Sequence, residues 1–435
     1  MYKSAIIFIF TCFSFVLFAQ VERSVQGAFG AVTIDGKVWN QIALRPVIPI
    51  WKFGVALDLV FYIDANGNIH KDEWDFSDGE AIKNTLIDKI YYIRFGFPND
   101  PLYFKVGSLD YVKLGYGILV DGYSNAIEYP QVRKVGLDFS VKRNLFSVQG
   151  FANDFKENLG LIGVRVQSSK LMNIPLGISA VIDRNQYLGL KDLDGDGRPD
   201  LVDDFPENSH YWLDTDGDGL ADNDTLNEFD VDGDGWTDPS FTFETYGVVI
   251  DTDGVETKPE PINLKKDTDK ITAIAFDIGY PIITEQNLSV AIYAQAAKLI
   301  GETKYPGIPD STVSLGSGII PVGIATKIGP VHFNLEYRII PKGNFEFGYW
   351  NQTYEVERVS IEGSLIKTKE SKLGRFGKQK GIYAHFGMDI FSLLGFTIAY
   401  QNLRGDIWDG NTFSEQANQS FQSEIGLKKS ISKIK

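Results

Sequence analysis

Three short runs of aspartate and glycine are the residues of this chain with the clearest chemistry. Each run has the pattern D-x-D-G-D-G-x-x-D, and the runs begin at Asp192, Asp214 and Asp230. A hard divalent cation such as Ca²⁺ takes about six to eight oxygen ligands, and carboxylates at loop positions 1, 3 and 5 can surround it. A glycine at position 6 allows the sharp turn, and the carbonyl of position 7 adds an oxygen. The repeated spacing therefore predicts calcium-binding loops.

The expected ligand set follows from these positions. It comprises Asp192, Asp194, Asp196, Arg198, Asp200 and Asp203 in the first copy, Asp214, Asp216, Asp218, Leu220 and Asp222 in the second, and Asp230, Asp232, Asp234, Trp236 and Asp238 in the third. Arg198, Leu220 and Trp236 would contribute their backbone carbonyls. The alternative is a solvated acidic segment that binds no specific ion, although unpaired carboxylates this close repel one another.

The residues after position 9 distinguish between calcium modules. Position 12 is Asp203, Thr225 or Phe241, so the glutamate of an EF-hand is absent. From Asp192 to Pro206 the chain reads D-x-D-x-D-G-x-x-D-x-x-D-x-x-P and resembles the thrombospondin type 3 repeat, with Phe205 where that family has a cysteine. The resemblance implies neighbouring loops that wrap their ions into a compact structure with little hydrophobic core.

The negative charge of the chain is concentrated around these runs. The formal net charge is −15, and residues 190–260 alone carry −19, so the remaining residues carry +4. Because no basic stripe stands out, a nucleic-acid partner is not expected. The acidic residues favour a cation, and Ca²⁺ is the one cofactor that we predict.

The first residues have the features of a secretory signal peptide. Lys3 precedes an apolar run from Ala5 to Phe18, and Ala19 is the expected residue before the cleavage site. The run is shorter than the roughly 18 to 20 residues that a membrane-spanning helix needs, and no such run follows it. The only cysteine, Cys12, lies in this leader, so we expect neither a disulfide nor a cysteine nucleophile.

The rest of the chain repeats a period of two residues. Apolar and small or polar residues alternate over residues 53–63, 135–142, 331–340, 382–390 and 394–401. This alternation is typical of β-strands with two different faces. We count roughly sixteen to eighteen such segments, and the sequence therefore predicts an all-β chain.

The strands fit either a soluble sandwich or a membrane barrel, because the less apolar face suits a soluble surface as well as a wet lumen. The connections favour the barrel. Short connections such as residues 329–330 and 391–393 alternate with long ones at 184–270, 301–316, 342–379 and 404–419. This parity would place all long loops at one end. The pattern resembles, at the level of architecture, porin-like outer-membrane barrels with short inner turns and long outer loops.

Several segments are harder to interpret. Residues 80–89 have helical spacing and could form a turn helix, a plug or a miscounted strand. Residues 102–125 are glycine-rich and are expected to form a pair of barrel strands rather than a phosphate-binding loop. The chain ends at Lys435 instead of the terminal aromatic residue common in such barrels, so either the sequence is incomplete or its assembly signal is atypical.

The sequence thus predicts an exported transmembrane antiparallel β-barrel in the cell outer membrane. Residues 1–19 would be the signal peptide, 20–189 and 271–435 the two parts of the barrel, and 190–270 an external calcium-binding insert. Asp58, Glu336, Arg338 and Gln401 are expected to line its lumen. The four histidines form no catalytic pattern, so no enzyme is predicted.

Three functions remain open. The first is a porin-like channel for small solutes. The second is a surface protein that binds or adheres to a partner through its calcium-ordered loop, with the barrel held in outer-membrane lipid. The third is a soluble, secreted calcium-binding β protein. Single-channel conductance separates the first from the second, and release from membranes by carbonate or urea would indicate the third.

Overall fold

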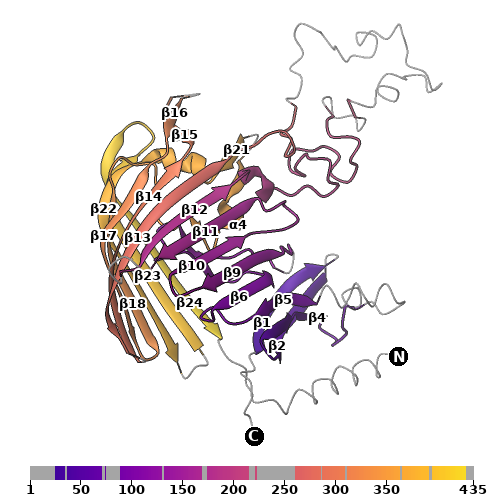
Figure 1. Ribbon diagram of the computed structural model, residues 1–435. Coiled ribbons are helices and arrows are strands. Elements are labelled where there is room, and N and C mark those ends of the chain that lie inside the picture. Colours follow the sequence, from indigo (N-terminus) through magenta and orange to yellow (C-terminus); the bar gives the residue numbers. More distant parts are fainter. Residues whose placement is uncertain are drawn as a thin grey trace, which may run out of the picture. The chain divides into compact units, whose positions relative to one another are not determined.

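The computed structural model describes residues 25–34, 37–70, 74, 89–129, 132–168, 174–214, 221–222, 260–285, 287–308, 311–362, 365–390 and 394–427 (Figure 1). The expected signal peptide, residues 80–88 of the expected helical segment and the whole third acidic run lie outside these ranges. Among the described residues, no helix is both long and apolar enough to cross a membrane.

Strands make up nearly all of the regular structure. The large sheet contains β1 (Val25–Ile34), β2 (Lys37–Ile50), β3 (Phe53–Leu57), β4 (Leu59–Ile63), β5 (Ile90–Phe95), β6 (Leu102–Gly107), β9 (Gly136–Lys142), β10 (Phe146–Ala152), β11 (Leu161–Ser168), β12 (Leu176–Asp183), β13 (Ile271–Thr284), β14 (Leu288–Ile300), β17 (Ser317–Ile328), β18 (Val331–Ile340), β22 (Phe376–Ile390), β23 (Leu394–Trp408) and β24 (Phe413–Leu427). Smaller elements are β7 (Val112–Lys113), β8 (Val120–Tyr123), β15 (Glu302–Lys304), β16 (Thr312–Ser314), β19 (Trp350–Asn351), β20 (Val359–Glu362), β21 (Leu365–Thr368), α4 (Tyr354–Glu357), η2 (Gln186–Gly189) and η4 (Glu370–Arg375).

The large sheet has seventeen segments that amount to sixteen strands. Only Asp58 separates β3 from β4, and both segments pair with β2, so they form one interrupted strand. Antiparallel pairing connects successive strands of the large sheet, as in β9–β10–β11 and, across the insertion of β19 to β21, β17–β18–β22–β23–β24. Figure 1 shows β13, β14, β17 and β18 side by side in a curved sheet. The predicted all-β fold with sixteen to eighteen antiparallel strands is confirmed.

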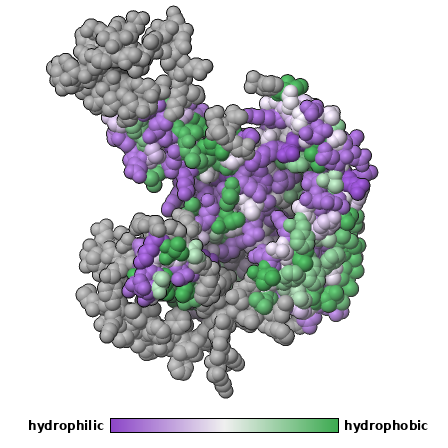
Figure 2. Space-filling model, turned by 180° about the vertical axis from the view of Figure 1, so that it is seen from behind, coloured by the Kyte–Doolittle hydropathy of each residue, from purple (hydrophilic) through white to green (hydrophobic). Residues whose placement is uncertain are grey.

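The two faces of this sheet differ in chemistry. Along β13 the side chains of Ile274, Phe276, Ile278 and Tyr280 are exposed, whereas the intervening Asp277 is buried. Figure 2 shows hydrophobic side chains gathered in a band on the visible surface of the molecule. We call the face that holds Asp277 the polar face and the opposite one the apolar face. A soluble sheet would bury the apolar side chains and expose the charges, so this sheet has the reverse arrangement.

Part of the glycine-rich stretch at residues 102–125 departs from the prediction. β6 joins the large sheet, but β7 and β8 form a separate three-stranded sheet with β19. β8 and β19 pair in parallel, with Val120 opposite Trp350. We call β7, β8 and β19 the inserted sheet. The prediction of two barrel strands here is wrong because strands this short carry too little alternation to reveal which sheet they join.

The last predicted long connection is also wrong. β23 continues to Trp408 and β24 begins at Phe413. A short turn at residues 409–412 therefore replaces the expected loop at 404–419. The Asp409 carboxylate accepts hydrogen bonds from the backbone N–H groups of Asn411 and Thr412 and closes this turn. Gln416 and Asn418, which belong to the expected loop, lie within β24.

The chain divides into two compact units. The first comprises Met1–Ile182, Thr272–Tyr354 and Leu373–Lys435, and it contains most of the large sheet. The second comprises Asp183–Ile271 and Glu355–Lys372 and includes the first acidic run. In the second unit, the buried Arg358 guanidinium forms an ion pair with Asp183 (3.0 Å) and donates a hydrogen bond to the carbonyl of Asn185. These contacts join its two chain segments.

Candidate functional site

A network of buried charges crosses the polar face. Tyr293 of β14 donates a hydrogen bond from its hydroxyl to the Glu336 carboxylate of β18, at 2.7 Å. The second oxygen of Glu336 accepts a hydrogen bond from Arg338 Nε at 2.7 Å, and Arg338 also donates to Gln401 Oε1 of β23. The Arg338 guanidinium lies 3.6 Å from the ring centre of Tyr383 on β22. Four strands therefore contribute to one network, because residues that face each other in the register share a face.

A second ion pair lies on the same face. Arg165 of β11 donates two hydrogen bonds to the Asp277 carboxylate of β13, at 2.9 and 2.6 Å, and a third to Gln167. Asp277 is opposite Gln295 of β14 in the register, which places it on the face of Tyr293. Both charged side chains are more than nine-tenths buried. Such bidentate pairs fix the positions of both partners.

Closer to the first strands, Arg45 of β2 donates a hydrogen bond to Asp58 at 2.8 Å. The other Asp58 oxygen accepts a hydrogen bond from the Tyr129 hydroxyl at 2.7 Å. The Arg45 guanidinium also lies 4.3 Å from the ring centre of Tyr91. Positive and negative groups on the polar face are thus matched one to one in these three clusters.

The inserted sheet contacts the polar face. The Tyr116 ring stacks on that of Tyr293 with centres 4.1 Å apart and planes 2° from parallel. A side chain at position 279 would collide with the Tyr116 hydroxyl, so glycine at this position allows the Tyr116 ring to lie close to β13. The N–H of Ile118 donates to Gln295 Oε1 at 3.3 Å. Several strands of the polar face are therefore covered by the segment around β7 and β8.

The chain around β19 holds the segment around β7 and β8 in place. The N–H groups of Gly348 and Trp350 donate to the carbonyls of Ile118 and Leu119, both at 3.0 Å. Aromatic side chains around them are fully buried, namely Tyr123, Tyr349, Trp350 and Tyr354. Lys113 and Asp121 of the inserted sheet form an ion pair at 2.9 Å, and both keep about a quarter of their side-chain surface exposed. This pair is the accessible charge of the inserted sheet among the residues described here.

The predicted lumen residues share the polar face. Asp58, Glu336 and Arg338 are buried there in ion pairs, and Gln401 is the hydrogen-bond partner of Arg338. The sequence did not indicate Tyr116, Lys113 or Asp121. The glycines at 115, 117 and 122 were a signal of tight turns, but they did not show which surface those turns would contact.

The first acidic run folds into a compact loop in the second unit. One carboxylate oxygen from each of Asp192, Asp194 and Asp196 lies within 4.8 Å of the other two. The Asp192 carboxylate accepts hydrogen bonds from the N–H groups of Gly195 (2.8 Å) and Gly197 (3.0 Å). Gly195 and Gly197 have φ angles of 77° and 102°, in the left-handed region that glycine adopts readily. The predicted turn around the three aspartates is therefore present.

Asp203 adds an oxygen that has no partner within the described residues. The residue is 7% exposed, and its Oδ1 accepts a hydrogen bond from the N–H of Phe205. Its Oδ2 is buried without a hydrogen-bond partner, as are the Oδ2 atoms of Asp194 and Asp196. Burial, together with the negative charges of Asp196 and Asp194, raises the pKa of Asp203 to about 6. Asp203 is outside the cluster of Asp192, Asp194 and Asp196, but it is close enough for their charges to act on it. A hard cation bound between these unsatisfied anionic oxygens would remove the repulsion.

The returning chain clamps this loop. Lys265 Nζ donates to the carbonyls of Gly195 (2.7 Å) and Asp196 (3.0 Å), and the N–H of Leu264 donates to the carbonyl of Gly197. The Arg198 side chain forms an ion pair with Glu260 and lies over the ring of Trp212. In the part of the chain that the structure describes, no hydrogen bond from Lys265 or Arg198 reaches the unsatisfied Oδ2 atoms of Asp194, Asp196 and Asp203. Lys265 and Glu260 were not predicted, because nothing in the local pattern relates them to Asp192.

The other predicted ligands have different positions. Asp200 accepts a hydrogen bond from the N–H of Leu193, and the backbone N–H of Asp214 donates to the Asp204 carboxylate. Asp214 and Asp222, the two ends of the second run, are described, but residues 215–220 between them are not. Outside the described residues lie Asp216, Asp218, Leu220, Asp230, Asp232, Asp234, Trp236 and Asp238. Their roles as calcium ligands stay predictions.

Comparisons with known proteins give structural likenesses alone. No protein-family model and no curated protein sequence matches the chain. Among solved structures, OmpT of Vibrio cholerae is 8% identical, with 93% of this chain and 95% of that chain covered and a TM-score of 0.33. OpdK of Pseudomonas aeruginosa is 7% identical (92% and 86% covered, TM-score 0.35), and OprD of the same organism is 9% identical (92% and 81% covered, TM-score 0.32). All three are outer-membrane proteins by description, but TM-scores this low do not assign the chain to a family.

Proposed function

We propose that this protein is an outer-membrane β-barrel that forms a narrow, porin-like channel and carries an external calcium-binding insert at residues 190–270. The observation that supports the barrel is the reversed chemistry of the sheet. Exposed apolar side chains such as Phe276 and Phe333 stand on one face, and buried ion pairs such as Arg165–Asp277 lie on the other. Lipid outside and water inside is the environment in which this arrangement is stable.

The energetics favour lipid over water for the apolar face. Exposed apolar side chains recur on β13, β14, β17, β18, β22 and β24, and include Ile278, Ile292, Ile324, Leu335, Ile382 and Phe421. Full transfer of a large apolar side chain from water to an apolar medium contributes about 1.5 to 3 kcal/mol, and each of these partly exposed side chains would gain a fraction of that. A contiguous surface of this kind marks a contact with lipid or another protein. A surrounding lipid phase accounts for the recurrence of exposed apolar side chains on so many strands.

The polar face then lines a lumen that the inserted sheet narrows. Solutes would pass the partly exposed Lys113–Asp121 ion pair, whose positive and negative groups lie 2.9 Å apart. With paired charges along the wall, we expect weak selectivity between small cations and anions. The proposal assigns no catalytic step to these residues.

Single-channel recording tests the channel. Purified, folded protein in planar lipid bilayers should give stepwise currents, with a reversal potential close to zero in a salt gradient. Asp121→Asn should shift the reversal potential toward anion selectivity, because it leaves Lys113 uncompensated. Protein that migrates as a heat-modifiable folded barrel and resists carbonate extraction, yet passes no current, would disprove the channel and leave the barrel.

We further propose that the first acidic run binds one Ca²⁺ through Asp192, Asp194, Asp196 and Asp203, with Asp200 and the Arg198 carbonyl as additional ligands. The unsatisfied Oδ2 atoms of Asp194, Asp196 and Asp203 support this assignment. By the repeated spacing, the second and third runs would bind further ions. Extracellular calcium modules have Kd values of about 10⁻⁴ to 10⁻³ M, so such loops would be loaded outside the cell.

Removal of calcium tests the insert. With millimolar Ca²⁺ the insert should resist protease, and a chelator should make residues 190–261 the first site of cleavage. Asp194→Ala should lower calcium affinity at the first run at least about tenfold, because a charged ligand is lost. Glu207→Ala is a matched control that removes one negative charge outside the aspartate pattern. Equal digestion with and without chelator would contradict calcium binding.

A further inference from the structure

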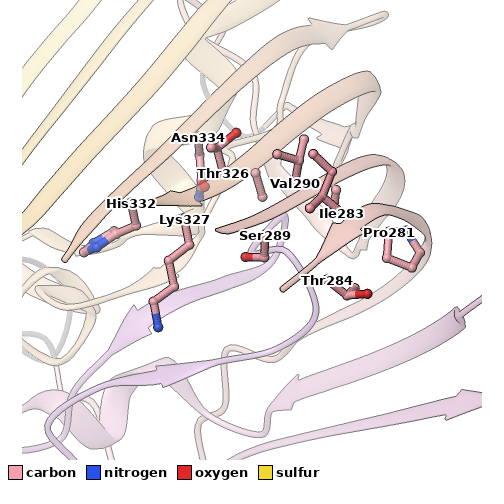
Figure 3. Close-up of a pocket in the computed structure, with 11 residues that line it drawn as sticks. Pro281, Ile283, Thr284, Ser289, Val290, Thr326, Lys327, His332 and Asn334 are labelled. Carbon is pink, nitrogen blue, oxygen red and sulfur yellow. The ribbon is translucent and has the colours of Figure 1, made fainter. Parts of the chain in front are cut away.

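A small pocket lies on the large sheet near the turns that join β13 to β14 and β17 to β18 (Figure 3). Its volume is 280 Å³. It is lined by Pro281, Ile283, Thr284, Ser289, Val290, Ala291, Ala325, Thr326, Lys327, His332 and Asn334. Pockets for drug-sized ligands are larger, at roughly 300 to 1,000 Å³. This one suits a single chemical group of a solute.

The strand register places most of the lining on the polar face. Ser289 pairs with Lys327, and Lys327 pairs with His332 across β17 and β18. Ala325 pairs with Asn334 in the next row. Ser289 is four residues before Tyr293 on β14, and His332 is four residues before Glu336 on β18. Because side chains alternate along a strand, Ser289 and His332 share the polar face with Tyr293 and Glu336. Figure 3 shows Ser289 and Lys327 extending to the same side of the sheet.

The polar groups of the pocket suit an anion. Thr284 and Ser289 offer hydroxyls, Asn334 an amide, Lys327 an ammonium group and His332 an imidazole. None of the lining residues is acidic. Lys327 forms no ion pair with any residue in the described part of the chain, in contrast with Lys113, Arg165 and Arg338.

The charged groups nearest the pocket come from the neighbouring strand and turns. His332 stacks against His385 of β22, with ring centres 5.5 Å apart. The carboxylates closest along the strands are those of Glu285, in the turn after β13, and Asp389, near the end of β22, and neither lines the pocket. The site has a lysine and no arginine. A lysine binds a phosphate as a point charge, and hydroxyl and amide groups beside it can donate hydrogen bonds to further phosphate oxygens.

We propose that this pocket binds the phosphate group of a solute at the end of the lumen marked by the short turns. The inference rests on the proposed channel, since it requires the polar face to line a water-filled path. Lys327 supplies the charge, while Ser289 and Asn334 donate hydrogen bonds to the phosphate oxygens. The pocket would hold a phosphorylated solute at the end of the channel opposite the long loops.

Calorimetric titration of the folded full-length protein in detergent with inorganic phosphate tests the site. Wild-type protein should bind one phosphate saturably, and Lys327→Gln should weaken that binding at least about tenfold. Ser289→Ala should weaken it by a smaller factor. Lys378→Gln is the matched control, because it also removes one lysine charge from the sheet but lies at the start of β22, outside the pocket. Heat-dependent gel migration confirms that each variant is folded.

The outcomes separate this site from the channel. Absence of saturable phosphate binding, or equal weakening by Lys327→Gln and Lys378→Gln, overturns the pocket. Acetate bound as tightly as phosphate, with the same dependence on Lys327, overturns the assignment to phosphate. Phosphate binding that requires Lys327 in protein without conductance would retain the pocket and remove the channel. Conductance without phosphate binding would retain the channel and remove the pocket.

Discussion

At the scale of single residues, the buried charges of the three clusters on the polar face are each matched by a partner of opposite sign. Arg165 with Asp277, Arg338 with Glu336, and Arg45 with Asp58 come from positions that the strand register brings together. Removal of one partner from a buried ion pair typically costs about 3 to 5 kcal/mol, because the other charge remains in a poorly solvated place. The pairs therefore fix the alignment of neighbouring strands more than they add net stability.

The turn after β4 gives a prediction for pH. Asp64 accepts hydrogen bonds from Lys37 Nζ (2.9 Å) and from the N–H groups of Asn66 and Asn68, and these contacts lower its pKa below the usual value near 4. A lowered folded-state pKa stabilises the fold above the unfolded value, and this contribution disappears as the pH falls through the folded value. Asp64→Asn should therefore lower the melting temperature at pH 7 and have little effect near pH 2. A pH-independent difference between the two proteins would contradict this.

The sequence predicts which residues belong to the polar face but not their partners. The alternation alone placed Asp58, Glu336, Arg338 and Gln401 together on one side. The bond between Arg338 and Gln401 depends on the register of β18, β22 and β23, which no local pattern defines. The same holds for the contact of Lys265 with the first acidic run, about 70 residues away in the chain.

At the scale of elements, the inserted sheet is held by stacking and by backbone hydrogen bonds. Tyr116→Ala removes the ring that stacks on Tyr293, so the segment should loosen and the mean single-channel conductance should rise above that of wild type. Tyr305→Ala is the matched control, because Tyr305 contacts Phe413 instead. Equal conductance in wild type and Tyr116→Ala, with both control and variant folded, would show that this stacking does not restrict the path.

The strands were predictable because an alternation of ten or more residues averages over local exceptions. β18 has the predicted bounds Val331–Ile340, β22 covers the predicted segment 382–390, and β9 covers the predicted segment 135–142 except for its first residue. β7, β8 and β19 have two to four residues each, and their place is decided by contacts such as Ile118 with Gln295. Tertiary contacts of this kind leave no periodic signal in the sequence.

At the scale of the whole molecule, the question is what surrounds the apolar face. Ile278 lies near the middle of β13 and is 41% exposed. Arginine near the midplane of a bilayer destabilises a membrane barrel by about 2 to 4 kcal/mol. Ile278→Arg should therefore reduce the free energy of folding into lipid vesicles by this amount. Asn411→Arg, in the turn between β23 and β24, is the matched control and should change it by less than about 1 kcal/mol.

A soluble protein would respond differently to the same pair of variants. Arginine at a half-exposed surface position is tolerated in water, so near-neutral effects of both substitutions would indicate a secreted protein without lipid contact. The sequence alone left this choice open, because alternation looks the same whichever side is wet. The burial of Asp277 next to an exposed Ile278 is the observation that supports the proposed contact with lipid.

The parallel pairing of β8 with β19 has a consequence for the order of folding. Val120 and Trp350 are about 230 residues apart in the chain, and β9 to β14, β17 and β18 lie between them. Closing so long a loop costs entropy that two short strands cannot offset by themselves. The intervening hairpins must therefore assemble first, and the seating of β7, β8 and β19 is a late event. A newly folded molecule would pass through a wider, more permeable intermediate before its interior is filled.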